Sequence, residues 1–181
     1  MNHIKTLIKA DLIRYVGYDN LNYKSFFKAY FKNPGFRFLF WFRLCSSKNK
    51  FVFYVSRYYH RKYSIKYSLS IPYDTKIGGG LHLGHGHSIV INSNAKIGKN
   101  VNIAHFTSIG SNYSKAAIIG DNVYIGPNVN IVEDVVIGNG VIIGAGSVVC
   151  HSILDGNTVA GVPAKVIGLS NKHNFINNIA N

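Results

Sequence analysis

The sequence holds little cysteine and proline, few acidic residues and no long apolar run. Its two cysteines, Cys45 and Cys150, are too few for a disulfide scaffold and lack the spacing of metal ligands. No apolar stretch reaches the roughly 18 residues that a membrane-spanning helix needs. Residues 1–17 are interrupted by charges and contain no apolar core of a secretory signal. We therefore expect a soluble, cytoplasmic protein that folds without disulfides.

The composition also excludes intrinsic disorder, because 47% of the 181 residues are hydrophobic and only 15% are charged. A chain of this length builds one ordinary domain, or a core with a small appendage. It can bury enough apolar surface to fold without a structural metal.

Charge, aromatic residues and glycine are unevenly distributed along the chain. Residues 1–70 hold 14 Lys and Arg against 2 Asp and Glu, together with 19 of the 24 aromatic residues. Residues 71–181 hold 6 Lys and Arg against 5 Asp and Glu, and 16 of the 18 glycines. The net charge of +13 therefore belongs almost wholly to the first segment. No motif that reads nucleic acid accompanies this charge, so nucleic acid is not expected as a partner.

An aliphatic residue recurs every six positions after Ile77, and glycine often follows it. The clearest series is Ile119, Ile125, Ile131, Ile137, Ile143 and Val149. The spacing changes at two places. An offset of two residues at Ile89-Val90 predicts a bulge or a tight corner. Ten residues separate Ile109 from Ile119, which predicts that four extra residues loop out of the array.

A period of six belongs to neither a helix nor a simple strand, but to a short strand followed by a turn. Three such strands in each coil form a triangular prism of about four coils, roughly 19 Å long at the spacing of paired strands. Four asparagines occupy predicted turns, where this residue tolerates left-handed backbone: Asn94, Asn100, Asn122 and Asn139. A β-sandwich would need longer alternating strands, so the repeat predicts a hexapeptide β-helix.

The first segment shows helical periodicity instead of the six-residue repeat. Four helices are expected: residues 4–16 with Gly17 as the stop, 26–32 with Ser25 as the cap and Asn33-Pro34 as the end, 36–45, and 51–63. We expect their aromatic stripes to pack against one another and against the prism. The chain thus divides into a helical, basic, aromatic-rich segment at 1–70, a β-helix at 71–168 and a tail at 169–181.

Three stretches within the repeat carry a family resemblance: Leu83–Ile91, Ile119–Pro127, and Gly144–Val149 followed by Ala160–Lys165. They resemble three features of the left-handed β-helix acyltransferases, especially of the serine acetyltransferase branch. These are the segment with the catalytic histidine, the repeat after a protruding loop, and the closing signature. The resemblance implies a mainly β fold, a left-handed parallel β-helix after a small α-helical segment. It also implies acetyl-coenzyme A (acetyl-CoA) as co-substrate and a homotrimer with sites between subunits.

The chain departs from serine acetyltransferases at several positions. Ser70 replaces an acidic residue that orients their catalytic histidine, and Ala116 replaces a second histidine. The helical leader is shorter and matches only through residues 33–36 and Arg43, so a hexamer is not expected. This pattern is similar to that of the acetyltransferases of capsule, exopolysaccharide and lipopolysaccharide clusters. It predicts an O-acetyltransferase that acts on a sugar hydroxyl of a surface polysaccharide or its precursor.

Acetyl transfer from a thioester to a hydroxyl needs a base that takes the hydroxyl proton, and histidine suits this role near neutral pH. His85 matches the family's catalytic position, so the resemblance makes it the general base, with Asp74 a candidate to orient it. His105 is assigned to contact with the acceptor, whereas His82 and His87 are expected to serve packing. No carboxylate or cysteine accompanies these histidines, so no metal site is predicted.

Coenzyme A is expected to lie in a groove between two neighbouring prisms. Small residues let its pantetheine arm approach the backbone, and Gly126, Gly144 and Ala145 meet that need. A simple turn requirement remains the alternative for each of them. Lys165 is the predicted phosphate contact near the end of the prism, and Lys115 in the looped-out segment is a second. Either lysine could instead be merely solvated.

The basic aromatic run Arg57–Lys62 leaves two uses open for residues 1–70. Clustered positive charge attracts both an anionic glycan and the inner face of the membrane. Aromatic rings stack on sugars and also settle at membrane interfaces. The alternative is a packed helical cap whose Lys and Arg are solvated.

Three other functions remain open from the sequence. Serine O-acetylation and amino-sugar N-acetylation would use the same donor. A β-helix scaffold without catalysis would carry a decayed site, and His85 in its family context argues against that reading.

Overall fold

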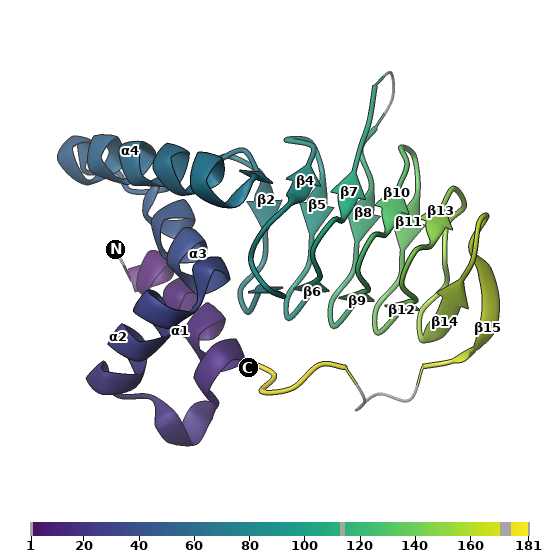
Figure 1. The fold of residues 1–181 in the computed structure, drawn as a ribbon, viewed down its shortest axis with the longest axis horizontal. Helices are drawn as coiled ribbons and strands as arrows, with labels where there is room; N and C mark the ends of the chain where they lie inside the picture. The colour runs from purple at the N-terminus through teal and green to yellow at the C-terminus, as the bar shows by residue number, and fades with distance from the viewer. Residues whose placement is uncertain (1, 113–114, 171–174, 181) are drawn as a thin grey trace.

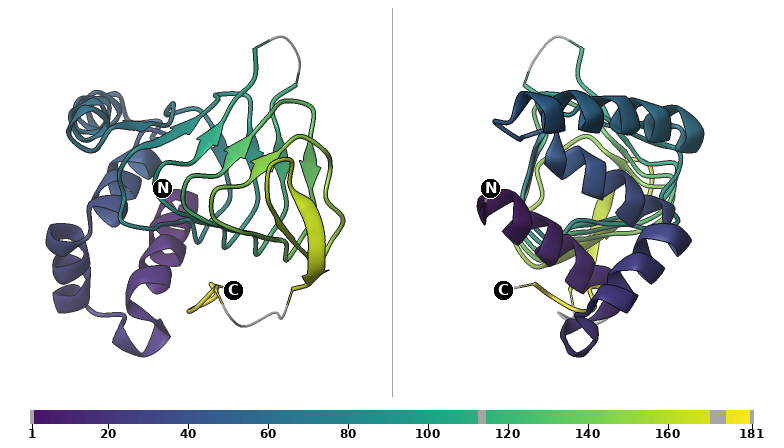
Figure 2. Two further views of the ribbon diagram at one scale, coloured as in Figure 1. Left: turned by 45° about the vertical axis from the view of Figure 1, so that its right-hand side comes forward. Right: turned by 90° about the vertical axis from the view of Figure 1, so that its left-hand side faces the viewer.

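The computed structural model describes residues 2–112, 115–170 and 175–180, and it shows a helical cap on one end of a three-sided β-helix (Figure 1). The helices are α1 (Asn2–Val16), the 3-10 helix η1 (Tyr18–Asn20), α2 (Tyr23–Lys32), α3 (Pro34–Leu44) and α4 (Lys50–Tyr67). Viewed from the cap, the four α-helices lie across the end of the prism (Figure 2). Among the described residues, no helix is both long and apolar enough to cross a membrane.

The helices begin where local chemistry satisfies their first backbone groups. The Asn22 side chain accepts a hydrogen bond from the Ser25 N–H at 2.9 Å, so Asn22 caps α2 and the prediction of Ser25 as the cap is wrong. An acceptor side chain must precede the N–H that it receives by two or three residues, and Asn22 stands at that distance. Pro34 opens α3, where its missing N–H costs nothing.

Short strands from successive coils stack into three sheets. The first sheet holds β1 (Leu69–Ser70), β4 (Ile89–Ile91), β7 (Ser108–Ile109), β10 (Asn130–Ile131) and β13 (Val148–Val149). The second holds β2 (Lys76–Ile77), β5 (Lys96–Ile97), β8 (Ile118–Ile119) and β11 (Val136–Ile137). The third holds β3 (His82–Leu83), β6 (Asn102–Ile103), β9 (Tyr124–Ile125), β12 (Ile142–Ile143), β14 (Asn157–Ala160) and the antiparallel β15 (Lys165–Leu169). The predicted left-handed parallel β-helix of about four coils is confirmed.

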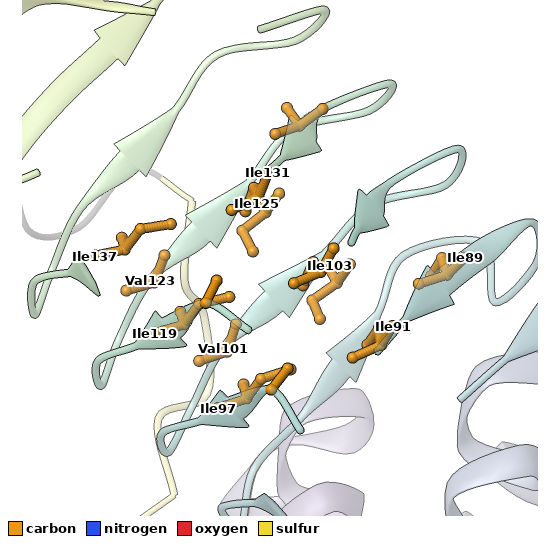
Figure 3. Packing of buried hydrophobic residues seen from close by; sticks show 14 of the residues in the cluster. Ile89, Ile91, Ile97, Val101, Ile103, Ile119, Val123, Ile125, Ile131 and Ile137 are labelled. Atoms are coloured by element: carbon orange, nitrogen blue, oxygen red, sulfur yellow. The ribbon is translucent and has the colours of Figure 1, made fainter. Parts of the chain in front are cut away.

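The core of the prism is a column of aliphatic side chains that the strands direct inward. Ile119, Ile125 and Ile131 come from three different sheets, and each is at most 2% exposed (Figure 3). Burying a side chain of this size contributes roughly 1.5–3 kcal/mol, so the six-residue series supplies much of the stability.

The register of the strands locates both irregularities of the repeat. Leu83 pairs with Ile103, and Ile91 pairs with Ile109, so the first coil has two more residues in this turn than the second. This confirms the predicted offset. The four extra residues after Ile109 leave the prism as a loop, of which residues 113–114 lie outside the described part (Figure 1).

Only some of the predicted turn asparagines take left-handed backbone. Asn100 and Asn122 do so, with φ of 54° and 56°. Asn94 and Asn139 lie in turns but have other conformations, and Gly140 with φ 65° takes the left-handed position beside Asn139. The Asn139 side chain instead accepts the backbone N–H of Asp121 at 2.8 Å. The Asn139 side chain therefore links two neighbouring coils.

The helical cap supplies partners for backbone groups that the first coil leaves unpaired. The Arg43 guanidinium donates to the carbonyls of Ile77 at 2.7 Å and Gly78 at 2.6 Å. Its Nε also lies 2.8 Å from Asp11 Oδ2, and both side chains are at most 3% exposed. Asp11 Oδ1 accepts the Leu81 N–H at 2.9 Å. An inner coil finds such partners in its neighbour, whereas here side chains of α1 and α3 replace that neighbour.

Candidate active site

The corner between the third and first sheets carries the predicted catalytic histidine. His82 lies on β3, His85 and His87 lie in the turn that follows, and His105 lies in the same turn one coil later. The two extra residues of the first coil fall in the turn of His85. His85 and Gly86 both take left-handed backbone, with φ of 61° and 63°. Left-handed backbone recurs at other corners of the prism, such as Phe106 and Asp134, so at His85 it marks a tight turn.

The helical cap holds this turn through backbone contact. A β-carbon on Gly86 would lie 2.2 Å from the Gly35 nitrogen at the start of α3. A β-carbon on Gly35 would lie 2.7 Å from the Leu83 carbonyl oxygen. The Tyr15 hydroxyl accepts the Leu83 N–H at 3.0 Å. Both glycines thus allow the helix and the turn to touch, and the cap determines where the His85 turn lies.

Three imidazole rings form a cluster on this corner. The ring centroids of His85 and His105 are 5.0 Å apart with planes at 87°, and that of His87 lies 5.6 Å from His105. His85 is exposed, whereas His105 is half-buried. The Nδ1 atom of His105 is buried and has no hydrogen-bond partner among the residues that the structure describes. The cluster therefore offers one accessible ring and, beside it, one unsatisfied ring nitrogen.

A pocket of about 240 Å³ adjoins the cluster. It is lined by His82, Gly84, His85, Asn102, Ile103, Ala104, His105, Tyr124 and Pro127. Burial, together with the nearby Arg14 and His85, lowers the pKa of His82 to about 4, so this ring is neutral at physiological pH. The His82 ring centroid lies 4.5 Å from that of Tyr15, which gives His82 a packing contact.

The structure places Asp74, the candidate to orient His85, away from this pocket, together with the changed positions Ser70 and Ala116. Ser70 pairs with Val90 across the first sheet and lines a groove along α4. Asp74 is exposed, Ala116 is buried in the core, and neither lines the histidine pocket. Within the described ranges, no group of three or more His, Cys, Asp and Glu side chains is arranged to hold a metal.

A row of small residues leads from the pocket toward the far end of the prism. Gly84, Ala104, Gly126 and Gly144 directly follow β3, β6, β9 and β12, and the register places Ala160, the last residue of β14, in line with them. Ala145 is exposed beside this row, and Lys165 pairs with Ala160 at its end. Three coil spacings, roughly 14 Å, separate His105 from Ala160. The structure therefore brings Gly126, Gly144, Ala145 and Lys165 onto the corner that carries His85 and His105.

Coil stacking alone accounts for two of the predicted glycines. A β-carbon on Gly126 would lie 2.8 Å from the Ala145 nitrogen. A β-carbon on Gly144 would lie 3.0 Å from the Ala160 β-carbon. The alternative that the sequence left open, a glycine that the fold itself needs at the turn, therefore holds for both residues, and it does not depend on a cofactor contact.

Lys115 lies on a different corner. It is exposed at the base of the loop between β7 and β8, and its carbonyl accepts the Asp134 N–H at 2.8 Å. Within one chain the structure does not bring Lys115 to the corner of His85.

Two polar residues of the pocket were missed in the sequence. Asn102 and Tyr124 occupy the strand position of His82 in the next two coils, since His82 pairs with Asn102 and Asn102 with Tyr124. The repeat period was the signal that could have found them. Adding the length of one coil to position 82 gives Asn102, and adding the length of the next coil gives Tyr124.

The chain is similar to serine acetyltransferases. Residues 116–151 match the family described as bacterial transferase hexapeptide (six repeats). The serine acetyltransferase of Buchnera aphidicola subsp. Schizaphis graminum is 36% identical over 118 residues, which are 62% of this chain and 45% of that protein. The match thus spans less than half the length of that relative.

Solved structures of serine acetyltransferases are also similar to this chain. The Neisseria gonorrhoeae serine acetyltransferase in complex with serine has a TM-score of 0.75 at 28% identity, covering 91% of this chain and 69% of that one. The serine acetyltransferase of Brucella abortus strain S19 in complex with coenzyme A has a TM-score of 0.75 at 25% identity, with coverage of 93% and 69%.

These similarities confirm the resemblance to hexapeptide-repeat transferases with serine acetyltransferase relatives. They also correct the acceptor. The prediction of a polysaccharide hydroxyl is wrong, because the relatives in sequence and in fold are serine acetyltransferases, which favours the serine alternative. Membership of the capsule and exopolysaccharide group is not supported. The prediction rested on several departures, among them the short helical leader, Ser70 and Ala116, and neither of these two residues lines the histidine pocket of the single chain.

Proposed function

We propose that this chain transfers acetyl from acetyl-coenzyme A to the side-chain hydroxyl of L-serine. Its similarity to serine acetyltransferases supports this, one of them solved with serine and one with coenzyme A. The observation that carries the proposal is the exposed His85 ring beside His105 on a pocket of about 240 Å³. A pocket of this size suits an amino acid.

His85 acts as the general base in this proposal. In its neutral form the imidazole takes the hydroxyl proton while the serine oxygen attacks the thioester carbonyl carbon. A C–O bond forms, the C–S bond breaks, and His85 returns the proton to the leaving sulfur. The thioester is already activated, so no covalent intermediate on the protein is needed.

His105 contacts the acceptor. Its buried Nδ1 has no partner in the described structure, and leaving a buried polar atom unpaired costs about 1–3 kcal/mol. A polar group of a bound acceptor would satisfy this nitrogen. The 5.0 Å separation of the two ring centroids puts such a group within reach of both His85 and His105.

The donor lies along the row of small residues. The exposed Ala145 lets a pantetheine arm approach the corner beside the half-buried Gly144, and the buried Gly126 lets the coil that carries Ala145 stack closely behind it. Lys165, exposed at the end of the row, meets a phosphate as a point charge. Lys115 would reach this donor only from a neighbouring subunit, which accords with the expected homotrimer.

The test is thiol release from acetyl-coenzyme A with L-serine as acceptor, with mass spectrometry of the amino acid product. We expect release that depends on serine and an acetylated serine. Glycine is the matched control, because it has the same backbone and no hydroxyl. Release no faster with serine than with glycine would overturn the proposal. Release that requires glucosamine instead would favour the amino-sugar alternative.

A further inference from the structure

The outer face of α2 alternates aromatic and basic side chains. Tyr23, Phe27 and Phe31 are 85%, 55% and 67% exposed. A lysine follows each of them, and all three lysines are exposed: Lys24, Lys28 and Lys32. Because an α-helix has 3.6 residues per turn, these two series form adjacent stripes on one side of the helix. We call these six residues the α2 face.

The inner side of α2 packs against the other helices, whereas the α2 face has no packing partner among the described residues. Ala29 is buried with Leu12 and Phe36, and Phe26 and Tyr30 pack against that cluster. The rings of Phe27 and Phe31 stack on the outside, with centroids 6.5 Å apart. Large aromatic side chains held together in solvent lose the stabilisation that burial gives, so they indicate a contact surface.

A groove continues the apolar surface of the α2 face. It has a volume of about 480 Å³ and is lined by Lys9, Leu12, Leu21, Asn22, Tyr23, Phe26 and Phe27. Lys9 is exposed and is the only charged residue in this lining. The surface thus combines exposed apolar area with positive charge at its edges.

Little negative charge offsets these lysines. Residues 1–70 contain two acidic residues, Asp11 and Asp19. Asp11 is 1% exposed and paired with Arg43, so Asp19 is the one that reaches solvent. The surface of the helical cap is therefore strongly basic.

We propose that the α2 face binds the surface of a lipid bilayer with anionic headgroups. Tyr23, Phe27 and Phe31 would enter the interfacial region, where aromatic rings are stable. The lysines would reach headgroup phosphates while their methylene stems stay in contact with the apolar layer. A second copy on this face would bring like charges together. A soluble anionic glycan would meet the lysines and stack on the exposed rings, but it has no apolar chain that fills the groove.

The test is co-sedimentation of the whole chain with vesicles. One set contains phosphatidylcholine alone, and the other contains phosphatidylcholine mixed with phosphatidylglycerol. We expect binding to the mixed vesicles, and we expect it to weaken as added salt screens the lysines. No acetyl transfer occurs in this assay, so its outcome is independent of the proposed function.

Two variants separate the charged and apolar contributions. Lys24→Gln/Lys28→Gln/Lys32→Gln should weaken partitioning roughly a hundredfold, because each lysine near an anionic surface contributes about fivefold. Phe27→Ser/Phe31→Ser should also reduce binding at low salt, because the rings no longer insert.

The prism offers a matched control for each variant. Lys76→Gln/Lys96→Gln/Lys99→Gln removes the same charge from exposed positions of the β-helix. Ile167→Ser/Leu169→Ser removes two apolar side chains, 67% and 80% exposed, from β15 at the far end. Both controls should bind vesicles like the wild type. Circular dichroism melting curves would verify that all four variants are folded.

Three outcomes would overturn the proposal. The first is absence of binding to the mixed vesicles at low salt. The second is equal binding by the α2 variants and their controls. The third is binding to a soluble polyanion such as heparin, but not to vesicles, with loss in the lysine variant alone. A change in oligomeric state of Phe27→Ser/Phe31→Ser, without vesicle binding by the wild type, would assign the face to a second copy.

Discussion

His85 is exposed, and its ring lies beside that of His105 on the pocket. The neighbouring His82 shows the opposite situation, since its ring packs on Tyr15 and burial lowers its pKa to about 4. Similar residues on one corner thus have different physical roles. The exposed ring on the pocket is the one expected to carry chemistry.

Replacing the proposed base should abolish most activity while leaving the fold intact. His85→Ala should lower turnover roughly a hundredfold to ten-thousandfold, the usual contribution of general-base catalysis. His85→Asn should be nearly as harmful, because an amide cannot accept the proton. Turnover with L-serine and thermal melting of each variant provide the measurement.

His105→Ala is the comparison for that prediction. If His105 contacts the acceptor, its loss should raise the KM for serine more than it lowers turnover. An outcome in which His105→Ala eliminates turnover while His85→Ala retains it would reverse the two assignments.

Lys165 is the site of a prediction about the donor. Lys165→Ala should raise the KM for acetyl-coenzyme A and leave turnover at saturation nearly unchanged, because a remote phosphate contact is similar in the ground and transition states. Lys76→Ala removes an exposed lysine from the second sheet and should change neither constant. An unchanged KM in both variants would make Lys165 a solvated lysine.

At the scale of elements, the start of α3 and the turn of His85 form one unit. The contact is between Gly35 and Gly86, where a β-carbon would meet backbone at 2.2 Å. The end of a long side chain can move aside, but backbone cannot. A substitution that pushes the start of α3 away from the turn should therefore displace His85 as well.

Gly86→Ala tests that coupling. We expect a large loss of turnover together with a lower melting temperature. Gly156→Ala is the control, because Gly156 has a similar φ of 68° but nothing within 4 Å of an added β-carbon. It should carry only the conformational penalty, about 1 kcal/mol, and keep turnover. Equal effects on turnover would argue against the helix contact.

The ion pair between α1 and α3 is a second prediction at this scale. Asp11→Ala leaves Arg43 without its carboxylate and the Leu81 N–H without an acceptor. Removing one partner of a buried pair costs about 3–5 kcal/mol, so the free energy of unfolding should fall by that order. Asp19→Ala removes an exposed carboxylate from the same cap and should have little effect. Urea denaturation of both variants makes the comparison, and equal midpoints would contradict it.

At the scale of the whole molecule, the prism presents apolar residues that its own fold does not cover. Ile118 and Val136 are neighbours on the second sheet and are 41% and 50% exposed. Val90 on the first sheet is 48% exposed. Flat sheet faces with such side chains are suited to contact with a further copy of the prism.

We predict a homotrimer in solution. Light scattering should give about three times the chain mass of 20.1 kDa. Ile118→Lys/Val136→Lys should produce a monomer with reduced turnover, because charge on the second sheet opposes association. Val162→Lys/Ile167→Lys, at positions 71% and 67% exposed near the far end, is the control and should remain trimeric. A wild-type monomer with full activity would contradict the prediction.

Much of the prism could be predicted because its repeat is local. Each coil contacts only its neighbours, so spacing along the chain becomes position in space. The same period identified the inward isoleucines, the offset before Ile91 and the loop after Ile109. It could also have indicated that Gly126 and Gly144 share the corner of His105, and that Asn102 and Tyr124 share the strand position of His82.

The sequence by itself thus determined the β-helix, its irregular corners and the histidine-bearing turn, because all three are periodic or lie within one coil. Only the tertiary structure decided how Asp11 and Arg43 close the first coil and how Gly35 holds Gly86. It also decided that Lys115 lies on another corner and that Ser70 lies outside the pocket. These facts depend on how the helices pack against the prism, or on which corner of the prism a residue occupies. No period along the chain encodes such relations, since each joins groups that are distant in sequence and meet only after folding.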